Sequence, residues 1–119
     1  MELSVLVVDD DPSFRELAGR LLADAGIRVA AQAESADEAI IAAEQTRPDA
    51  VLVDVDLPGR DGITLARELT ALPWRPRVVL TSVDPEAVGP DDMSSSGALA
   101  FLAKDQLANG TLVELLGFD

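Results

Sequence analysis

The feature that most constrains the fold is an alternation of two hydrophobic patterns, repeated five times along 119 residues. Short continuous apolar runs are typical of strands covered on both faces. Most of them are followed by apolar residues at helical spacing, and the helix at 85–96 is expected from its position in the order. The predicted strands are residues 5–8, 27–33, 50–53, 77–81 and 98–103, and the predicted helices are 12–25, 36–46, 63–72, 85–96 and 107–116. This order predicts a doubly wound α/β fold, with a five-stranded parallel sheet, right-handed crossovers and helices on both faces.

Composition indicates one globular domain, which we expect to span residues 1–119. Hydrophobic residues make up 48% of the chain, enough for one core. The sequence has no cysteine and no histidine, which excludes disulfides, thiolate metal sites and Ser-His-Asp chemistry. A net charge of −13 predicts that nucleic acid and anionic lipid are repelled. Apolar stretches are too short for a membrane span and the start lacks a signal-peptide pattern, so we expect a cytoplasmic protein without membrane contact.

Three aspartates follow the first and third predicted strands. Asp9 and Asp10 come directly after residues 5–8, and Asp54 comes directly after residues 50–53. Parallel α/β sheets keep their ligand sites at the carboxyl ends of strands, and clustered buried carboxylates are costly unless a cation compensates them. If the two strands are neighbours, the cluster predicts a site for a hard divalent cation, with one carboxylate available for chemistry.

Other features are expected to serve structure alone. Asp11 precedes Pro12 and is predicted to cap the first helix, and Asp61-Gly62 is predicted to be a turn at a helix entry. The helix at 85–96 is weakly encoded, because Gly89 and Pro90 both disfavour a helix interior. We therefore expect it to be short, broken or mobile, starting only near residue 91.

Several short motifs lie in order at successive strand ends: Asp9-Asp10, Asp54, Leu57-Pro58-Gly59, Asp61-Gly62, Thr81-Ser82, Gly97-Ala98 and Phe101-Leu102-Ala103-Lys104. In these motifs the chain resembles the receiver domain of bacterial two-component response regulators, over essentially its whole length. That resemblance implies a flavodoxin-like (βα)5 fold.

The resemblance implies that Asp54 is phosphorylated, by a phosphohistidine on a histidine kinase or phosphotransfer protein, or by a small acyl phosphate. It also implies a Mg²⁺ site in which Asp10 and Asp54 bind the ion directly and Asp9 binds it through water. The backbone carbonyl of Asp56 completes the protein ligands in that pattern. The preference of Mg²⁺ for oxygen ligands and retained waters agrees with this set.

The same resemblance implies a switch. Thr81 hydrogen-bonds one phosphoryl oxygen, Lys104 pairs with another, and the rotamer of Phe101 follows Thr81. The surface formed by the fourth helix, fifth strand and fifth helix then changes and acts on a downstream protein target, which the sequence does not identify. The domain would catalyse only its own phosphorylation and dephosphorylation, so we do not expect an enzyme with a separate substrate.

Two alternatives remain open at this point. Asp54-Val55-Asp56 after an apolar strand superficially fits the nucleophile motif of haloacid-dehalogenase-like phosphatases, although that motif normally follows the first strand of a larger domain. The second alternative is a pseudo-receiver, which is an interaction module with the receiver fold that takes no phosphate. Steady turnover of phosphomonoesters would support the phosphatase, and missing Mg²⁺ binding would support the pseudo-receiver.

Overall fold

The computed structural model describes residues 3–117, so the two ends of the expected domain lie outside the described residues. Five strands form one sheet in the order β2-β1-β3-β4-β5, and all four neighbouring pairs are parallel. The strands are β1 (Ser4–Val8), β2 (Arg28–Ala33), β3 (Ala50–Asp54), β4 (Arg77–Ser82) and β5 (Ala100–Ala103). The predicted doubly wound, flavodoxin-like α/β fold is confirmed.

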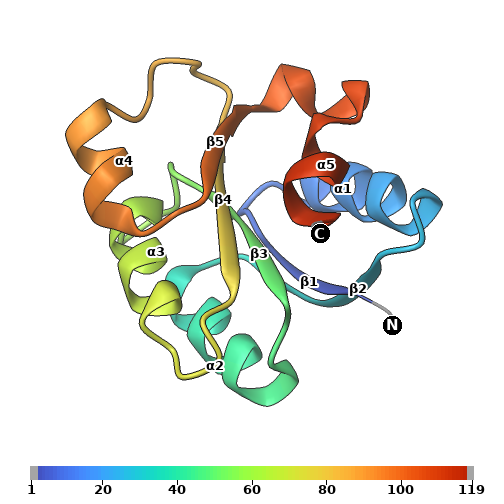
Figure 1. The fold of residues 1–119 in the computed structure, drawn as a ribbon, viewed down its shortest axis with the longest axis horizontal. Coiled ribbons are helices and arrows are strands. Elements are labelled where there is room, and N and C mark those ends of the chain that lie inside the picture. Colours follow the sequence, from blue (N-terminus) through green and yellow to red (C-terminus); the bar gives the residue numbers. More distant parts are fainter. Residues whose placement is uncertain (1–2, 118–119) are drawn as a thin grey trace.

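The helices cover both faces of this sheet. They are α1 (Pro12–Asp24), α2 (Ala36–Thr46), α3 (Gly62–Thr70), α4 (Pro90–Ser96) and α5 (Thr111–Gly117), with a 3₁₀ helix at Lys104–Asn109. Figure 1 shows α1 and α5 on one side of the sheet and α2, α3 and α4 on the other. Within residues 3–117, none of the helices combines the length and the apolar character that crossing a membrane requires.

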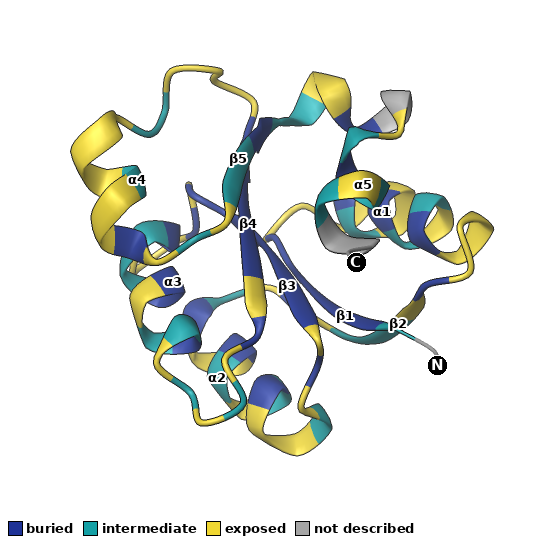
Figure 2. Ribbon diagram, in the orientation of Figure 1, coloured by how far each residue is buried: buried dark blue, intermediate teal, exposed yellow. Residues whose placement is uncertain are grey.

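The central strands β1 and β3 are almost entirely apolar because each face of the sheet packs against helices. In β1, Val5 and Val7 belong to the core shared with α1 and α5, whereas Leu6 and Val8 belong to the core shared with α2 and α3. All five residues of β1 and of β3 are buried (Figure 2). The two central strands are therefore packed on both faces, and this packing fixes the position of the residues at their carboxyl ends.

The predicted cap at Asp11 and the predicted helix entry at Asp61-Gly62 are confirmed. The Asp11 carboxylate accepts a hydrogen bond of 2.9 Å from the Ser13 N–H at the start of α1. The Asp61 carboxylate accepts one of 2.8 Å from the Thr64 N–H at the start of α3. Such bonds satisfy N–H groups that a helix leaves unpaired in its first turn.

The second half of the chain corrects several predicted boundaries. The fourth helix does not span 85–96 but begins at Pro90, where a missing N–H costs nothing, and ends at Ser96. Gly97 caps it with a φ of 78°. It is short, as expected. The fifth strand starts at residue 100 rather than 98, because Gly97 turns the chain out of the helix first. The last helix starts at residue 111 rather than 107, after the turn at Gly110 with a φ of 88°.

Candidate functional site

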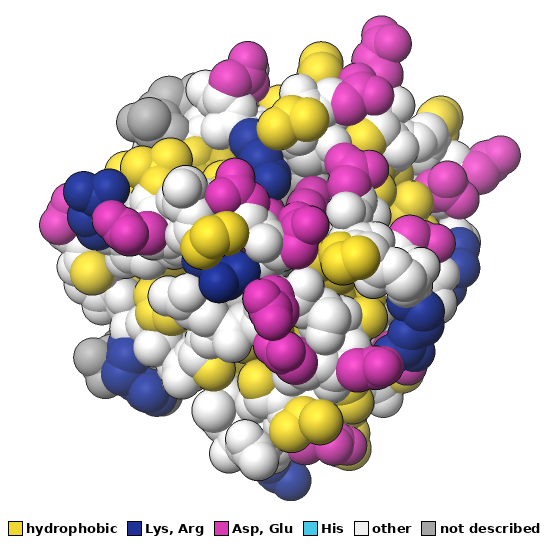
Figure 3. Space-filling view, turned by 180° about the vertical axis from the view of Figure 1, so that it is seen from behind, with side chains coloured by type: hydrophobic (Ala, Val, Ile, Leu, Met, Phe, Trp, Pro, Cys, Tyr) yellow, Lys and Arg dark blue, Asp and Glu magenta, His cyan; other side chains and the backbone are white. Residues whose placement is uncertain are grey.

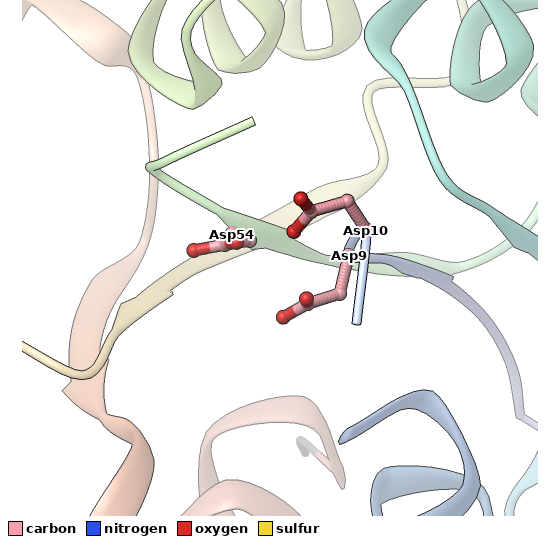
Figure 4. A group of neighbouring side chains, drawn as sticks. All are labelled: Asp9, Asp10 and Asp54. Atoms are coloured by element: carbon pink, nitrogen blue, oxygen red, sulfur yellow. The ribbon is translucent and has the colours of Figure 1, made fainter. Parts of the chain in front are cut away.

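The three aspartates meet at the carboxyl edge of the sheet. Asp54 is the last residue of β3, and Asp9 and Asp10 follow β1, its neighbour in the sheet. One carboxylate oxygen from each residue lies within 4.8 Å of the other two, and Figure 4 shows the three side chains together. The predicted convergence is confirmed. Oxygen donors at this spacing fit a hard divalent cation.

Burial sets the electrostatics of this cluster. The side chain of Asp9 is fully buried and that of Asp54 is nearly so, whereas Asp10 is exposed. Burial raises the pKa of Asp54 from 3.8 to about 6; the Asp56 backbone N–H lowers it, the Asp9 charge raises it, and the Lys104 ammonium lowers it. Asp54 is thus ionised at neutral pH but more basic than an ordinary aspartate, which suits a nucleophile.

Lys104 places a positive charge beside the carboxylates of the two buried aspartates. It follows β5, and its Nζ lies 2.7 Å from Asp9 Oδ2 and 3.8 Å from Asp54 Oδ2. Its side chain is only 15% exposed, so the pair with Asp9 is poorly screened by water. In this structure Lys104 is therefore a counter-ion of Asp9 first and of Asp54 second.

Thr81 lies beside Asp54. The two residues are register partners on β4 and β3, and the Thr81 main-chain carbonyl accepts a hydrogen bond of 2.9 Å from the Val55 N–H. The Thr81 hydroxyl is fully buried and has no hydrogen-bond partner among the described residues. A buried hydroxyl without a partner is costly, so a ligand oxygen arriving at Asp54 would gain a donor already in place.

Phe101 is partly buried in β5 and packs against the core on the side of α2, α3 and α4. It is the register partner of Leu80, one residue before Thr81. The structure therefore places Phe101 next to the strand that carries Thr81. The expected rotamer change of Phe101 stays a prediction.

The loop after β3 is held by contacts that the sequence analysis did not identify. The Asp56 N–H donates to Asp54 Oδ1 at 3.2 Å, and the Ser82 hydroxyl donates to Asp56 Oδ2 at 2.8 Å. The second bond ties this loop to the end of β4. At the end of this loop the backbone of Gly62 packs closely against that of Asp54. Only glycine fits there, because a Cβ would lie 2.3 Å from the Asp54 carbonyl oxygen.

Arg15 was also missed. Its guanidinium donates to the main-chain carbonyl of Asp9 at 2.6 Å and to the Gln32 side chain at 3.3 Å. It therefore fastens the chain at the point where β1 leads into the acidic cluster. An arginine six residues after a strand-end aspartate carries no signal by itself, because its partner is a backbone group.

A doubly wound five-stranded domain with three aspartates at the ends of β1 and β3 defines a class of signalling domain. Residues 5–116 match the model of the response regulator receiver domain family, and the chain belongs to that family. It is a receiver domain of two-component response regulators, and its aspartate cluster is consistent with a phosphoacceptor site.

Individual relatives agree with this family. "Response regulator GacA" of Pseudomonas protegens is 37% identical over 103 residues, which cover 86% of this chain and 48% of GacA. A "protein-glutamate methylesterase/protein-glutamine glutaminase" of Syntrophus aciditrophicus is 35% identical over 109 residues, which cover 89% of this chain and 31% of that enzyme. The chain thus spans half or less of the length of these curated relatives.

Solved structures agree as well. The crystal structure of a LuxR-family two-component response regulator from Aurantimonas sp. SI85-9A1 superposes with a TM-score of 0.83 at 26% identity, covering 98% of this chain and 87% of that one. Membership of the receiver family argues against the phosphatase interpretation of Asp54-Val55-Asp56.

Proposed function

We propose that Asp54 is the phosphoacceptor of this receiver domain. The observation that carries the proposal is a nearly buried carboxylate of raised pKa, set between a lysine ammonium and the unpartnered hydroxyl of Thr81. An Asp54 oxygen attacks the phosphorus of a phosphohistidine, a P–O bond forms as the P–N bond breaks, and the imidazole leaves with the electron pair and takes up a proton. A small acyl phosphate serves as donor in the same way, with a carboxylate as the leaving group.

Mg²⁺ is the cofactor in this proposal, and the donor set fits it, because three carboxylates offer only oxygen. Asp10 and Asp54 would hold the ion directly, Asp9 through water, and the Asp56 carbonyl would complete the set. When bound, the ion supplies neutralisation of the charge on the transferring phosphoryl group. The chain itself positions the nucleophile and keeps water from its buried side.

After transfer, Thr81 and Lys104 hold the phosphoryl group in this proposal. The Thr81 hydroxyl donates to one oxygen, which gives it the partner that it lacks beforehand. Lys104 pairs with another oxygen and leaves Asp9. Movement of Thr81 opens space for Phe101, and the surface of α4, β5 and α5 changes with it, which is a local event that biases a two-state surface.

The partners follow from the same chemistry. We propose a histidine kinase or a phosphotransfer protein as donor and a protein as downstream target, with the domain acting on no substrate but its own phosphoryl group. We propose no direct contact with nucleic acid: the net charge is −13, and acidic side chains outnumber basic ones on the face in Figure 3. A single receiver domain over residues 1–119 and a cytoplasmic location belong to this proposal.

Incubation with acetyl phosphate tests the proposal. The intact mass should rise by one phosphate in the presence of Mg²⁺ and should stay unchanged in the presence of EDTA. A protein that binds Mg²⁺ poorly and gains no phosphate would be a pseudo-receiver instead. Continuous release of phosphate from a simple phosphomonoester would favour a phosphatase.

A further inference from the structure

Lys104 has a third neighbour besides the two aspartates. Its Nζ lies 4.3 Å from the centre of the Phe14 ring, over the ring face. The ammonium therefore has the Asp9 carboxylate, the Asp54 carboxylate and an aromatic face around it. Phe14 comes from the first turn of α1 and Lys104 from the end of β5, so the fold alone brings them together.

The ring is the fixed member of this contact. Phe14 is 7% exposed and packs in the core shared by α1, α5 and the sheet, together with Ala18 and Leu22 of the same helix. A lysine side chain, by contrast, is a flexible stem that carries a point charge. Because the ring is held by packing, its face limits where the ammonium settles.

An aromatic face does what an aliphatic side chain cannot do at this place. The Lys104 side chain is 15% exposed, so part of its hydration shell is lost. Leucine would fill the space but offer the cation nothing, whereas the negative face of a phenyl ring attracts it, more strongly where water is excluded. Only a π face both closes the core and compensates the charge.

We propose that Phe14 is a positioning residue that holds the Lys104 ammonium between Asp9 and Asp54. The position of the ammonium is inferred from the distances of Lys104 Nζ to the Phe14 ring and to the two carboxylates. Its consequence for phosphoryl transfer rests on the proposed function, in which Lys104 pairs with a phosphoryl oxygen. If the ring keeps Nζ near Asp54 before phosphoryl transfer, the Lys104 side chain loses less conformational freedom during that transfer.

The sequence makes the contact directly measurable, because Lys104 is the only lysine among the nine basic residues. Protein labelled with ¹³C-lysine shows one lysine side chain. A ring face shields nuclei above it, so the Lys104 ε-methylene protons should resonate upfield of a free lysine in the wild type. Phe14→Leu should return them to the free position, and Phe14→Tyr should keep them upfield. An unshifted wild-type signal overturns the contact.

Phosphorylation by acetyl phosphate in Mg²⁺ tests the consequence, with time courses followed by intact mass. Phe14→Leu should slow phosphorylation about fivefold, as expected for a partly desolvated cation–π contact, and Phe14→Tyr should restore it. Leu22→Val serves as the control, since it loosens the same core on the same helix without touching Lys104. It should lower the melting temperature and leave the rate unchanged.

A double-mutant cycle separates positioning from packing. In a Lys104→Met background, Phe14→Leu should have no further effect on the rate, because no ammonium remains to be held. Equal slowing with and without Lys104 would show that Phe14 only supports the core, and would overturn the inference. If the wild type takes no phosphate, the proposed function fails. The ¹³C-lysine spectra then test the positioning of Lys104 by themselves. A shielded lysine signal supports the contact with Phe14, and an unshielded signal refutes it.

Discussion

Because the charge of Asp54 is buried, we predict that it lowers the free energy of unfolding of the metal-free protein. Raising the carboxyl pKa from 3.8 to about 6 costs the folded state about 3 kcal/mol at pH 7.5, where Asp54 is ionised in both states. Between these two values the folded protein binds more protons than the unfolded chain. The contribution of Asp54 to stability is therefore lost as pH rises through this window, and about half of the loss has occurred by pH 5.

Asp54→Asn removes the charge and keeps an acceptor for the Asp56 N–H, which lies 3.2 Å from Asp54 Oδ1. Guanidinium unfolding in a chelating buffer should show the variant about 2–3 kcal/mol more stable than wild type at pH 7.5. The difference should shrink to about half at pH 5. Saturating Mg²⁺ should reduce this stability difference at pH 7.5, because an ion that binds the folded wild-type protein stabilises that protein.

Glu44→Gln is the matched control, since it removes one carboxylate from an exposed position on α2. It reports the effect on stability of removing one negative charge from a net charge of −13, which should be within about 0.5 kcal/mol. The reasoning is refuted if Asp54→Asn is no more stable than wild type at pH 7.5. It is also refuted if the gain is the same at pH 5 and pH 7.5.

Three further predictions concern the surroundings of the site. Gly62→Ala should destabilise the domain by more than about 2 kcal/mol in chemical denaturation, because its Cβ would meet the Asp54 carbonyl oxygen at 2.3 Å, whereas Gly19→Ala, with its nearest contact at 3.9 Å, should not. Amides of residues 91–96 should exchange with solvent faster than those of residues 17–22, because α4 has seven residues and buries only Ser96; equal protection would contradict this. The chain alone should not shift a random DNA duplex, and a salt-sensitive micromolar shift would overturn that prediction.

The fold and the acidic cluster were predictable because their signals are local. A continuous apolar run such as residues 5–8 indicates a strand covered on both faces, and an aspartate directly after it must lie at the sheet edge. Asp9, Asp10 and Asp54 converge because β1 and β3 are adjacent, which the alternation of strands and helices favours but does not encode in any single segment.

The remaining contacts depend on distances in space that no sequence spacing reports. The bond between Ser82 and Asp56 joins the end of β4 to the loop after β3, and the Phe14 ring meets Lys104 across ninety residues of chain. The ion pair of Lys104 with Asp9 was also not predicted, since the family pattern assigns Lys104 to the phosphoryl group. The late start of α4 was predicted to within one residue, near 91 against Pro90 in the structure, because Gly89 and Pro90 disfavour a helix interior.

The site of phosphorylation tests the central claim most directly. Protein treated with acetyl phosphate and Mg²⁺ is reduced with borohydride, which converts an aspartyl phosphate to homoserine, and the modified residue is located by peptide mass. The account predicts homoserine at position 54 in the wild type and in Asp56→Asn, and no modification in Asp54→Asn. Modification at Asp56, or an Asp54→Asn protein that still gains one phosphate at the wild-type rate, would contradict it.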